Sequence, residues 1–428
     1  MESSLSESVQ QLVRPGKCVD LYYPDPETAE KQCFRTIQNT RYVQQFANLT
    51  GGSSTFTIPP NNGIQDIVLI FELPAIAAPG NSSLAIPRAW GYALIKQISF
   101  RYGGSSQYFL SGQQLLQATL RKASNPVSRD DIFALGGSAA AGATLATAQR
   151  AAVWLPLPHC VPTAEGKLPP LPSDLLTQQI QVTCELNPIG SIFSVAAGGS
   201  IASVPSALNF AEFQVQQVEF ANQGDALARR VDMTSHALSY PIEFTQQEVI
   251  IPLADNATAQ TVTLTGFRSG EVRNIQCWIT VDADTPAAPV VGNIVNPYKW
   301  YSPEDMVMTY AGSIYARFDK GSGALWNLVN GRQAPAVNEV LVADAGGAVC
   351  SVTTPFLGRW LELPFAQTFD PLTAHSMYTA GLPITNGIVN LQFNLPQNLA
   401  ATTGMKLHVS YVYNGVLTFS QGTADYVI

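Results

Sequence analysis

The sequence predicts an all-β protein built from two tandem β-sandwiches. Three observations predict this class. Short runs that alternate apolar and polar residues, or are wholly apolar, recur along the chain and end at Gly, Pro or Asn. Helical patterns are few, which argues against a parallel sheet alternating with helices. The chain has 428 residues, of which 46% are hydrophobic, so it is long enough to bury two cores.

The first half of the chain contains five predicted strands. The second of them is a continuous apolar run closed by Pro74, and the fourth alternates until it stops at Asn187 and Pro188. Such boundaries are typical of strands, because Pro lacks the N–H that a sheet needs. The predicted strands are Ser54–Ile58, Ile67–Leu73, Tyr92–Tyr102, Gln178–Leu186 and Phe213–Phe220.

The second half repeats this pattern and adds a predicted hairpin. The run Met405–Tyr413 is followed by Asn414 and Gly415, and then by Val416–Phe419. An Asn-Gly pair favours a type I′ turn, in which both central residues have positive φ. The other predicted strands are Gln247–Ile251, Gln260–Gly266, Asn274–Val281, Asp305–Tyr310 and Gly387–Phe393.

Predicted helices are short and scattered. Gln113–Ala123 combines good helix formers with an apolar stripe. Leu5–Val13 predicts a short helix in the N-terminal arm, and Asp225–Val231 predicts one or two turns. Ala139–Ala152 is rich in Ala and is compatible with a helix or with a loop of small residues.

The stretch 222–247 interrupts the strand pattern and divides the chain. Blocks of strands of similar size lie on either side of it. We therefore expect an N-terminal arm at residues 1–33, a first sandwich at 34–222, a connector at 223–247 and a second sandwich at 248–428.

The charge content of the chain is unusually low. Lys and Arg number 23 and Asp and Glu 31, which gives a net charge of 23 − 31 = −8. Only 13% of the residues are charged, about half the usual share. Sparse, scattered Lys and Arg disfavour nucleic-acid binding. A neutral surface suits a chain that is covered by copies of itself, since large permanent interfaces are poor in charge.

A secreted β-protein with a neutral surface is the alternative interpretation. The sequence MESSLSESVQQLV at the start of the chain does not have the pattern of a secretory signal, which disfavours it. The six cysteines include no C-x-x-C pair, so we expect them to be reduced and mostly buried.

The sequence predicts no catalytic, cofactor-binding or metal-binding residues. Phosphate-binding, zinc-protease and nucleophile-elbow motifs are absent. Asp232, Ser235 and His236 form the densest polar cluster, but neighbouring positions on one segment rarely build a catalytic triad. The other histidines are His159, His375 and His408, and His408 should face outward or pair on a strand. Three carboxylate pairs are interpreted as exposed turn acids: Asp130 and Asp131, Asp282 and Asp284, and Glu304 and Asp305.

Several segments, in order along the chain, carry a resemblance to a known family. Ala89–Gly104 (AWGYALIKQISFRYGG) resembles a strand segment of the double jelly-roll major capsid proteins of nucleocytoplasmic large DNA viruses and their relatives. Leu155–His159 followed by Gln178–Leu186, the stretch 220–247, and Met377–Phe393 are similar to later segments of that family. Pro158–Cys160 stands where the family has aromatic residues, so the resemblance is to a divergent member.

The resemblance implies two eight-stranded jelly rolls in each subunit and no enzyme activity. It also implies a homotrimer that forms a pseudo-hexagonal capsomer and tiles the icosahedral shell of a double-stranded DNA virus. The implied partners are neighbouring capsomers, minor capsid or penton proteins and an internal membrane, with no sequence-specific nucleic acid and no cofactor. The implied location is the virion, assembled inside the infected host cell.

The resemblance also implies roles for four loops rich in small residues. The loops 135–152, 189–207, 282–297 and 332–347 would form towers or interfaces, so a charge at Ala140 is expected to impair assembly more than folding. Two other functions stay open: a carbohydrate-binding or carbohydrate-cleaving β-sandwich protein, and a viral spike or penton protein.

Overall fold

The computed structural model describes most of the chain from residue 37 to residue 427. The residues within this range that it does not describe are 60–62, 78–79, 104–106, 123–125, 156–170, 172, 174–175, 221–237, 269, 294, 302, 320–335, 344–348, 359, 366–381, 385–387, 396, 400 and 421. The predicted arm at 1–33, the predicted helices Leu5–Val13 and Asp225–Val231, and His159, His236 and His375 lie outside the described residues.

Eight strands of the first half form two antiparallel four-stranded sheets. One sheet has the order β1 (Ile37–Gln45), β11 (Phe210–Phe220), β3 (Gly63–Leu73) and β8 (Gln149–Leu155). The other has the order β2 (Gly52–Ile58), β9 (Ile180–Leu186), β5 (Ile95–Tyr102) and β6 (Gln107–Leu110). Non-consecutive strands are thus neighbours in both sheets, as in a jelly roll.

The second half repeats this order. One sheet consists of β12 (Leu238–Thr245) with β13 (Val249–Pro252), then β23 (Met405–Ser420), β15 (Gly270–Val281) and β20 (Leu361–Pro364). The second sheet has the order β14 (Ala259–Leu264), β22 (Val389–Asn394), β16 (Asp305–Tyr310) and β17 (Ser313–Phe318). β21 (Leu382–Ile384) pairs with β15, and β24 (Thr423–Val427) pairs with β23. The predicted fold class, two eight-stranded jelly rolls, is confirmed.

The connections between strands carry the helices and the small sheets. In the described residues the α-helices are α3 (Trp90–Leu94), α4 (Gly112–Lys122) and α5 (Pro126–Leu135). β4 (Leu84–Ile86) pairs with β10 (Ser194–Val195) and β7 (Ala140–Ala141), and β18 (Ala336–Ala343) pairs with β19 (Val349–Gly358). Short 3₁₀ turns are η2 (Gly80–Ser83), η3 (Gly142–Ala146), η5 (Ile189–Ile192), η6 (Ile201–Ser203), η7 (Asp282–Asp284) and η8 (Gln397–Leu399).

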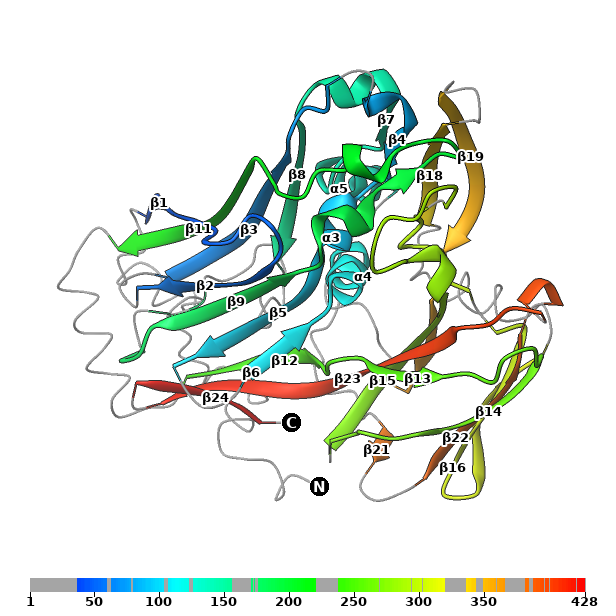
Figure 1. The fold of residues 1–428 in the computed structure, drawn as a ribbon. Helices are drawn as coiled ribbons and strands as arrows, with labels where there is room; N and C mark the ends of the chain where they lie inside the picture. Colours follow the sequence, from blue (N-terminus) through cyan, green and yellow to red (C-terminus); the bar gives the residue numbers. More distant parts are fainter. Residues whose placement is uncertain are drawn as a thin grey trace, which may run out of the picture.

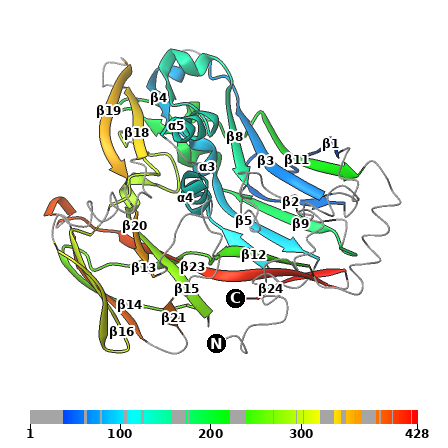
Figure 2. The same cartoon turned by 180° about the vertical axis from the view of Figure 1, so that it is seen from behind.

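The two jelly rolls stand side by side in the molecule. Figures 1 and 2 show β12 and β23 running alongside the edge of the first jelly roll that β5 and β6 form, while α4 lies between the first jelly roll and the sheet of β15 and β23. β4, β18 and β19 gather at one end of the molecule in both views. No helix in the part of the chain that the structure describes is long and apolar enough to span a membrane.

Alternation along the strands builds the cores. In β2, Ser54, Phe56 and Ile58 are buried while Thr55 is exposed. Phe56 stacks on Phe213 of the facing sheet, with ring centroids 4.5 Å apart. β14 alternates in the same way, with Val262 and Leu264 buried in the second core. Burial of apolar surface stabilises each sandwich by about 25 cal/mol per Å².

The structure corrects four predictions made from local sequence patterns. The hairpin at Asn414 and Gly415 is wrong, because β23 runs unbroken through both residues and pairs with β12 there. Residues 92–94 belong to α3 and not to a strand. Residues 238–245, placed in the connector, form β12. The segment 139–152 is neither a helix nor simply a loop, because it contains β7, η3 and the start of β8.

Other predictions made from the sequence are confirmed. The helix expected at Gln113–Ala123 is α4. Cys184 and Cys277 are free and fully buried, as expected. Burial raises the pKa of the Cys277 thiol to about 12, so this thiol stays protonated at neutral pH.

Candidate functional site: the interface between the jelly rolls and the open surfaces

Three of the carboxylates singled out in the sequence, Asp282, Asp284 and Asp305, are engaged with the protein itself. Asp282 forms an ion pair with Lys406 at 2.6 Å, and Asp284 forms one with Lys299 at 2.9 Å. Asp305 accepts hydrogen bonds from the backbone and side chain of Asn394. Among the residues that the structure describes, no group of three or more His, Cys, Asp or Glu side chains could hold a metal ion.

The outer face of the sheet of β15 and β23 is polar and yet buried. This face points away from the second core, and seven of its residues are between 0% and 7% exposed, while Lys406 at one end keeps its side chain 41% exposed. The first jelly roll covers it through α4, whose Gln113 and Gln114 bond to it. The seven buried residues of this face are Asn274, Gln276, Trp278, Thr280, His408, Ser410 and Val412.

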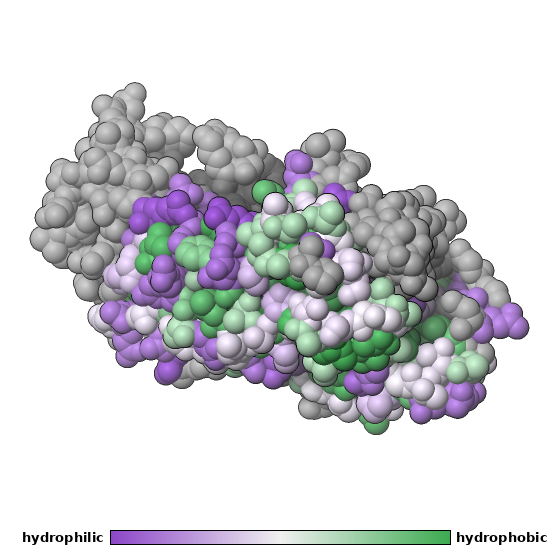
Figure 3. Space-filling view, turned by 45° about the horizontal axis from the view of Figure 1, so that its top comes forward, coloured by the Kyte–Doolittle hydropathy of each residue, from purple (hydrophilic) through white to green (hydrophobic). Residues whose placement is uncertain are grey.

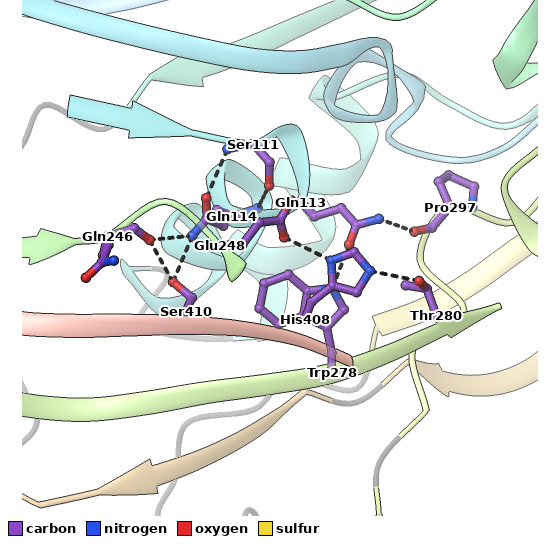
Figure 4. A network of polar contacts seen from close by, with 10 residues as sticks. All are labelled: Ser111, Gln113, Gln114, Gln246, Glu248, Trp278, Thr280, Pro297, His408 and Ser410. Carbon is purple, nitrogen blue, oxygen red and sulfur yellow. Dashed lines mark hydrogen bonds and ion pairs between the residues drawn. The ribbon is translucent and has the colours of Figure 1, made fainter. Parts of the chain in front are cut away.

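Two glutamines of α4 connect the helix to the second jelly roll (Figure 4). The Trp278 Nε1–H donates to Oε1 of Gln113 at 2.7 Å, and Gln113 donates to the Pro297 carbonyl at 3.4 Å. Gln114 Nε2 donates to the Ser410 hydroxyl at 2.8 Å and to the Gln246 carbonyl at 2.9 Å. Each bond joins residues more than 100 positions apart, so the bonds fix the relative placement of the two jelly rolls.

His408 lies at the centre of this interface. Its ring stacks on Trp278, with centroids 5.2 Å apart. Nε2 lies 2.8 Å from the Thr280 hydroxyl, and Nδ1 lies 3.2 Å from a carboxylate oxygen of Glu248. The expectation that His408 faces outward is wrong, because α4 covers the face to which it belongs, whereas its pairing on a strand is confirmed.

The order hydroxyl, imidazole, carboxylate is also that of a catalytic triad. A nucleophile must reach its substrate, however, and Thr280 is only 6% exposed, with His408 at 7%. This arrangement therefore orients side chains inside the interface. The sequence missed it because the three residues lie on separate strands or loops and no motif joins them.

Aromatic residues add further contacts between the jelly rolls. Tyr108 of β6 packs on Phe244 of β12, with ring centroids 5.2 Å apart. The Tyr298 hydroxyl donates to the Ala89 carbonyl at 2.6 Å, where Ala89 has a φ of 57° just before α3. Complete burial raises the pKa of Tyr298 well above its ordinary value, so it remains a donor.

Exposed apolar side chains lie at several places on the surface. Figure 3 shows hydrophobic patches interleaved with hydrophilic ones on one face of the molecule. The exposed large residues include Val43 on β1, and Ile314 and Tyr315 on the edge strand β17. The others among the described residues are Leu135, Ile201, Ile250, Val290, Val291 and Ile388. Exposed apolar surface of this kind is common at sites of protein association.

Comparisons with known proteins give matches only at the level of structure. No protein-family model matches the sequence, and no curated protein matches it. VP54 of PBCV-1, in a crystal structure fitted into a reconstruction of the virophage Sputnik, matches with a TM-score of 0.61 and 14% identity over 92% of this chain and 98% of that chain.

Two further solved structures match over similar lengths. The Faustovirus major capsid protein gives a TM-score of 0.53 at 8% identity, covering 90% of this chain and 91% of its own. The mavirus major capsid protein gives 0.52 at 11% identity, covering 92% and 90%. At these identities the likeness establishes the fold: the chain has the double jelly-roll fold of these capsid proteins.

Proposed function

We propose that this chain is the structural major capsid protein of an icosahedral double-stranded DNA virus. Three copies would form a homotrimer with a pseudo-hexagonal outline, and these capsomers would tile the shell. The observation that carries the proposal is the pair of jelly rolls with one strand order, packed side by side, in a chain that matches nearly the whole length of solved major capsid proteins.

The geometry explains how such a trimer would acquire its outline. Each chain supplies two similar units, so three chains place six similar units around a ring. Apolar burial between chains would contribute about 25 cal/mol per Å² before the costs of association. The low charge content supports this, since charged groups are depleted at the cores of interfaces.

The proposal includes the location and the partners. The protein would act in the virion, in contact with neighbouring capsomers, minor capsid or penton proteins and an internal membrane. We also propose an arm at residues 1–33, a first domain that begins near residue 34, and a second domain that begins with β12 near residue 238 instead of at 248. Pairing of Leu238–Thr245 with β23 favours a connector shorter than 223–247.

The protein would act without catalysis. The Thr280, His408 and Glu248 chain has its hydroxyl buried, and the Asp282 and Asp284 carboxylates pair with lysines. These observations give no support to the carbohydrate-cleaving alternative. A glycan array and a glycosidase screen test it directly, and activity in either would contradict the proposal.

Size-exclusion chromatography with light scattering tests the assembly. We expect a stable particle of about three times the chain mass of 46.0 kDa at micromolar concentration. Electron micrographs of the same fraction should give class averages with a hexagonal outline. A monodisperse monomer at that concentration would overturn the proposal.

A further inference from the structure

The boundary between the two jelly rolls is polar, whereas the core of each jelly roll is apolar. On β15, Ile275, Cys277 and Ile279 belong to the second core and are fully buried. Asn274 and Gln276 alternate with them and lie on the opposite face, which the first jelly roll covers. Apolar surface is stabilised simply by leaving water, but a buried polar group needs a hydrogen bond. The boundary is therefore stable only to the extent that its polar groups are paired.

Several polar groups at this boundary are buried without a partner. Among the described residues, neither the amide oxygen nor the amide nitrogen of Asn274 has a hydrogen-bond partner, and the same holds for Gln117 of α4. Gln117 follows Gln113 by four positions and Gln114 by three, which places it on the side of α4 that faces the second jelly roll. The indole N–H of Trp300, which packs against the boundary residue Trp278, has no acceptor in the described part of the chain either.

These groups lower the free energy that is needed to separate the two jelly rolls. A buried amide or indole gives up its bonds to water, and the groups of Asn274, Gln117 and Trp300 gain no bond from the described residues in exchange. Separation of α4 from the face of β15 and β23 would return water to that face. The apolar cores would stay closed, so the free energy of unfolding either core is not lowered in the same way.

The contacts that oppose separation beside α4 are hydrogen bonds that water can replace. Gln114 donates to Ser410 and to the Gln246 carbonyl, and Gln113 donates to the Pro297 carbonyl (Figure 4). Exchange of such bonds for bonds to water has a small net cost.

The aromatic contact between β6 and β12 behaves differently. Tyr108 and Phe244 are both buried, and their ring centroids lie 5.2 Å apart. Water cannot replace an apolar contact of this kind without a loss of stability. We therefore expect this contact to persist and to serve as the axis when α4 moves away from β15 and β23.

We propose that the two jelly rolls separate at this boundary as intact units, in an open state in which α4 leaves the face of β15 and β23 and water reaches that face. Opening changes the angle between the jelly rolls and leaves both cores folded. Partial openings of this kind occur at a lower free energy than global unfolding. The inference concerns a single chain and does not depend on the proposed role in a capsid.

A thiol introduced by Val412→Cys reports the open state. Val412 is fully buried on the boundary face, and its side chain makes no hydrogen bond that the substitution could remove. Cys277 is the control within the same molecule, because it is fully buried on the core side of β15. Only unfolding of the second core exposes Cys277.

Labelling with N-ethylmaleimide under native conditions, followed by peptide mass spectrometry, gives the rate at each position. We expect the thiol at position 412 to react about tenfold faster than Cys277, or more, because opening is more frequent than unfolding. Equal rates at the two positions would overturn the proposal. Thr280→Cys provides a second reporter on the same buried face should Val412→Cys not fold.

Two substitutions made together with Val412→Cys test the cause of opening. Gln114→Met removes the bonds to Ser410 and Gln246 and should raise the labelling rate at position 412 about fivefold or more. Asn274→Leu replaces the unpartnered amide by an apolar group of similar size and should lower this rate about threefold or more. Slow labelling of Cys277 in each variant shows that the second core is folded.

Ser54→Ala is the matched control for Asn274→Leu. The Ser54 hydroxyl is also buried without a partner among the described residues, but it lies on β2 in the first core. Its removal should leave the labelling rate at position 412 unchanged. An equal decrease in rate from Ser54→Ala and Asn274→Leu, or no decrease from Asn274→Leu, would contradict an opening that originates at the boundary.

Discussion

The indole N–H of Trp278 donates to the side-chain oxygen of Gln113 across the boundary between the two jelly rolls, at 2.7 Å. Trp278 is fully buried, so water cannot replace Gln113 as its acceptor. A buried donor left without a partner costs about 1–3 kcal/mol. Loss of this bond between the jelly rolls should therefore be measurable as a decrease in the free energy of unfolding.

Gln113→Met is expected to lower the free energy of unfolding by about 1–3 kcal/mol, because it removes the acceptor but keeps the length of the side chain. Urea unfolding followed by tryptophan fluorescence measures the change. Gln117→Met is the matched control on the same helix: Gln117 is 1% exposed, and its amide has no hydrogen-bond partner. This control should be neutral or stabilising, and equal losses from both variants would contradict the role of Gln113.

The polar interface explains which part of the site the sequence could not predict. Alternation in Asn274–Val281 and Met405–Tyr413 correctly predicted two strands. The same alternation indicated that His408 faces outward or pairs on a strand, and it pairs with β13 and β15. Whether the outer face meets water depends on α4, which lies far away in sequence, and no local pattern carries that information.

The failed hairpin has a similar cause. Asn414 and Gly415 have strong turn preferences, but they lie on β23 opposite Ile242 and Glu243 of β12. A strand that pairs continuously on one side gains more from the ladder than from a local turn. Tertiary pairing therefore overrides the preference, and the chain reverses later, at Gly422 between β23 and β24.

Low pH should lower the stability of the first jelly roll by protonating Glu72 of β3. The hydrogen bonds from Arg150 and then Asn209 lower the pKa of Glu72 below its ordinary value of 4.5. A lowered pKa in the folded state contributes stability above the unfolded pKa, and this contribution is lost as the pH falls through the folded pKa. The wild type should therefore lose melting temperature below about pH 4.5 more steeply than Glu72→Gln.

Melting curves between pH 3 and pH 7 measure this difference. Glu185→Gln is the control, because Glu185 pairs with Lys96 at an exposed site, where ion pairs contribute little. Parallel curves for the wild type and Glu72→Gln would show that the Arg150 and Asn209 contacts do not stabilise the fold.

A charge at Ala140 should damage folding, contrary to the expectation from the sequence. Ala140 is 2% exposed and pairs with Ile86 in the small sheet. Its side chain is therefore buried inside the subunit and is not available for contact with another chain. Ala140→Asp would bury a carboxylate without a partner, at a cost of several kcal/mol. We expect little soluble protein, or a melting temperature lowered by about 10 °C or more.

Ala143→Asp is the matched control: it places the same charge in the same segment, but at an exposed position. Ala143 lies in η3, three residues away, and is exposed. Its melting temperature should match the wild type within about 2 °C, since exposed substitutions usually change stability by less than about 0.5 kcal/mol. A similar loss in both variants would mean that the whole segment tolerates no charge.

Gly422 should be essential for docking of the last hairpin on the first jelly roll. It has a φ of +82°, and a Cβ there would lie 2.4 Å from Cγ2 of Thr177. The Thr177 backbone N–H also donates to the Gly422 carbonyl at 2.9 Å. Gly422→Ala therefore incurs both the strain of a left-handed residue, about 1–2 kcal/mol, and a steric clash.

Gly312→Ala isolates the first of these two costs. Gly312 has nearly the same φ, +83°, but a Cβ there meets no atom within 4 Å. Gly312→Ala should lower the free energy of unfolding by about 1–2 kcal/mol, and Gly422→Ala by about 1–3 kcal/mol more. Chemical denaturation of the two variants gives the difference. Because strain is common to both, equal losses would mean that the hairpin of β23 and β24 does not pack on Thr177 in solution.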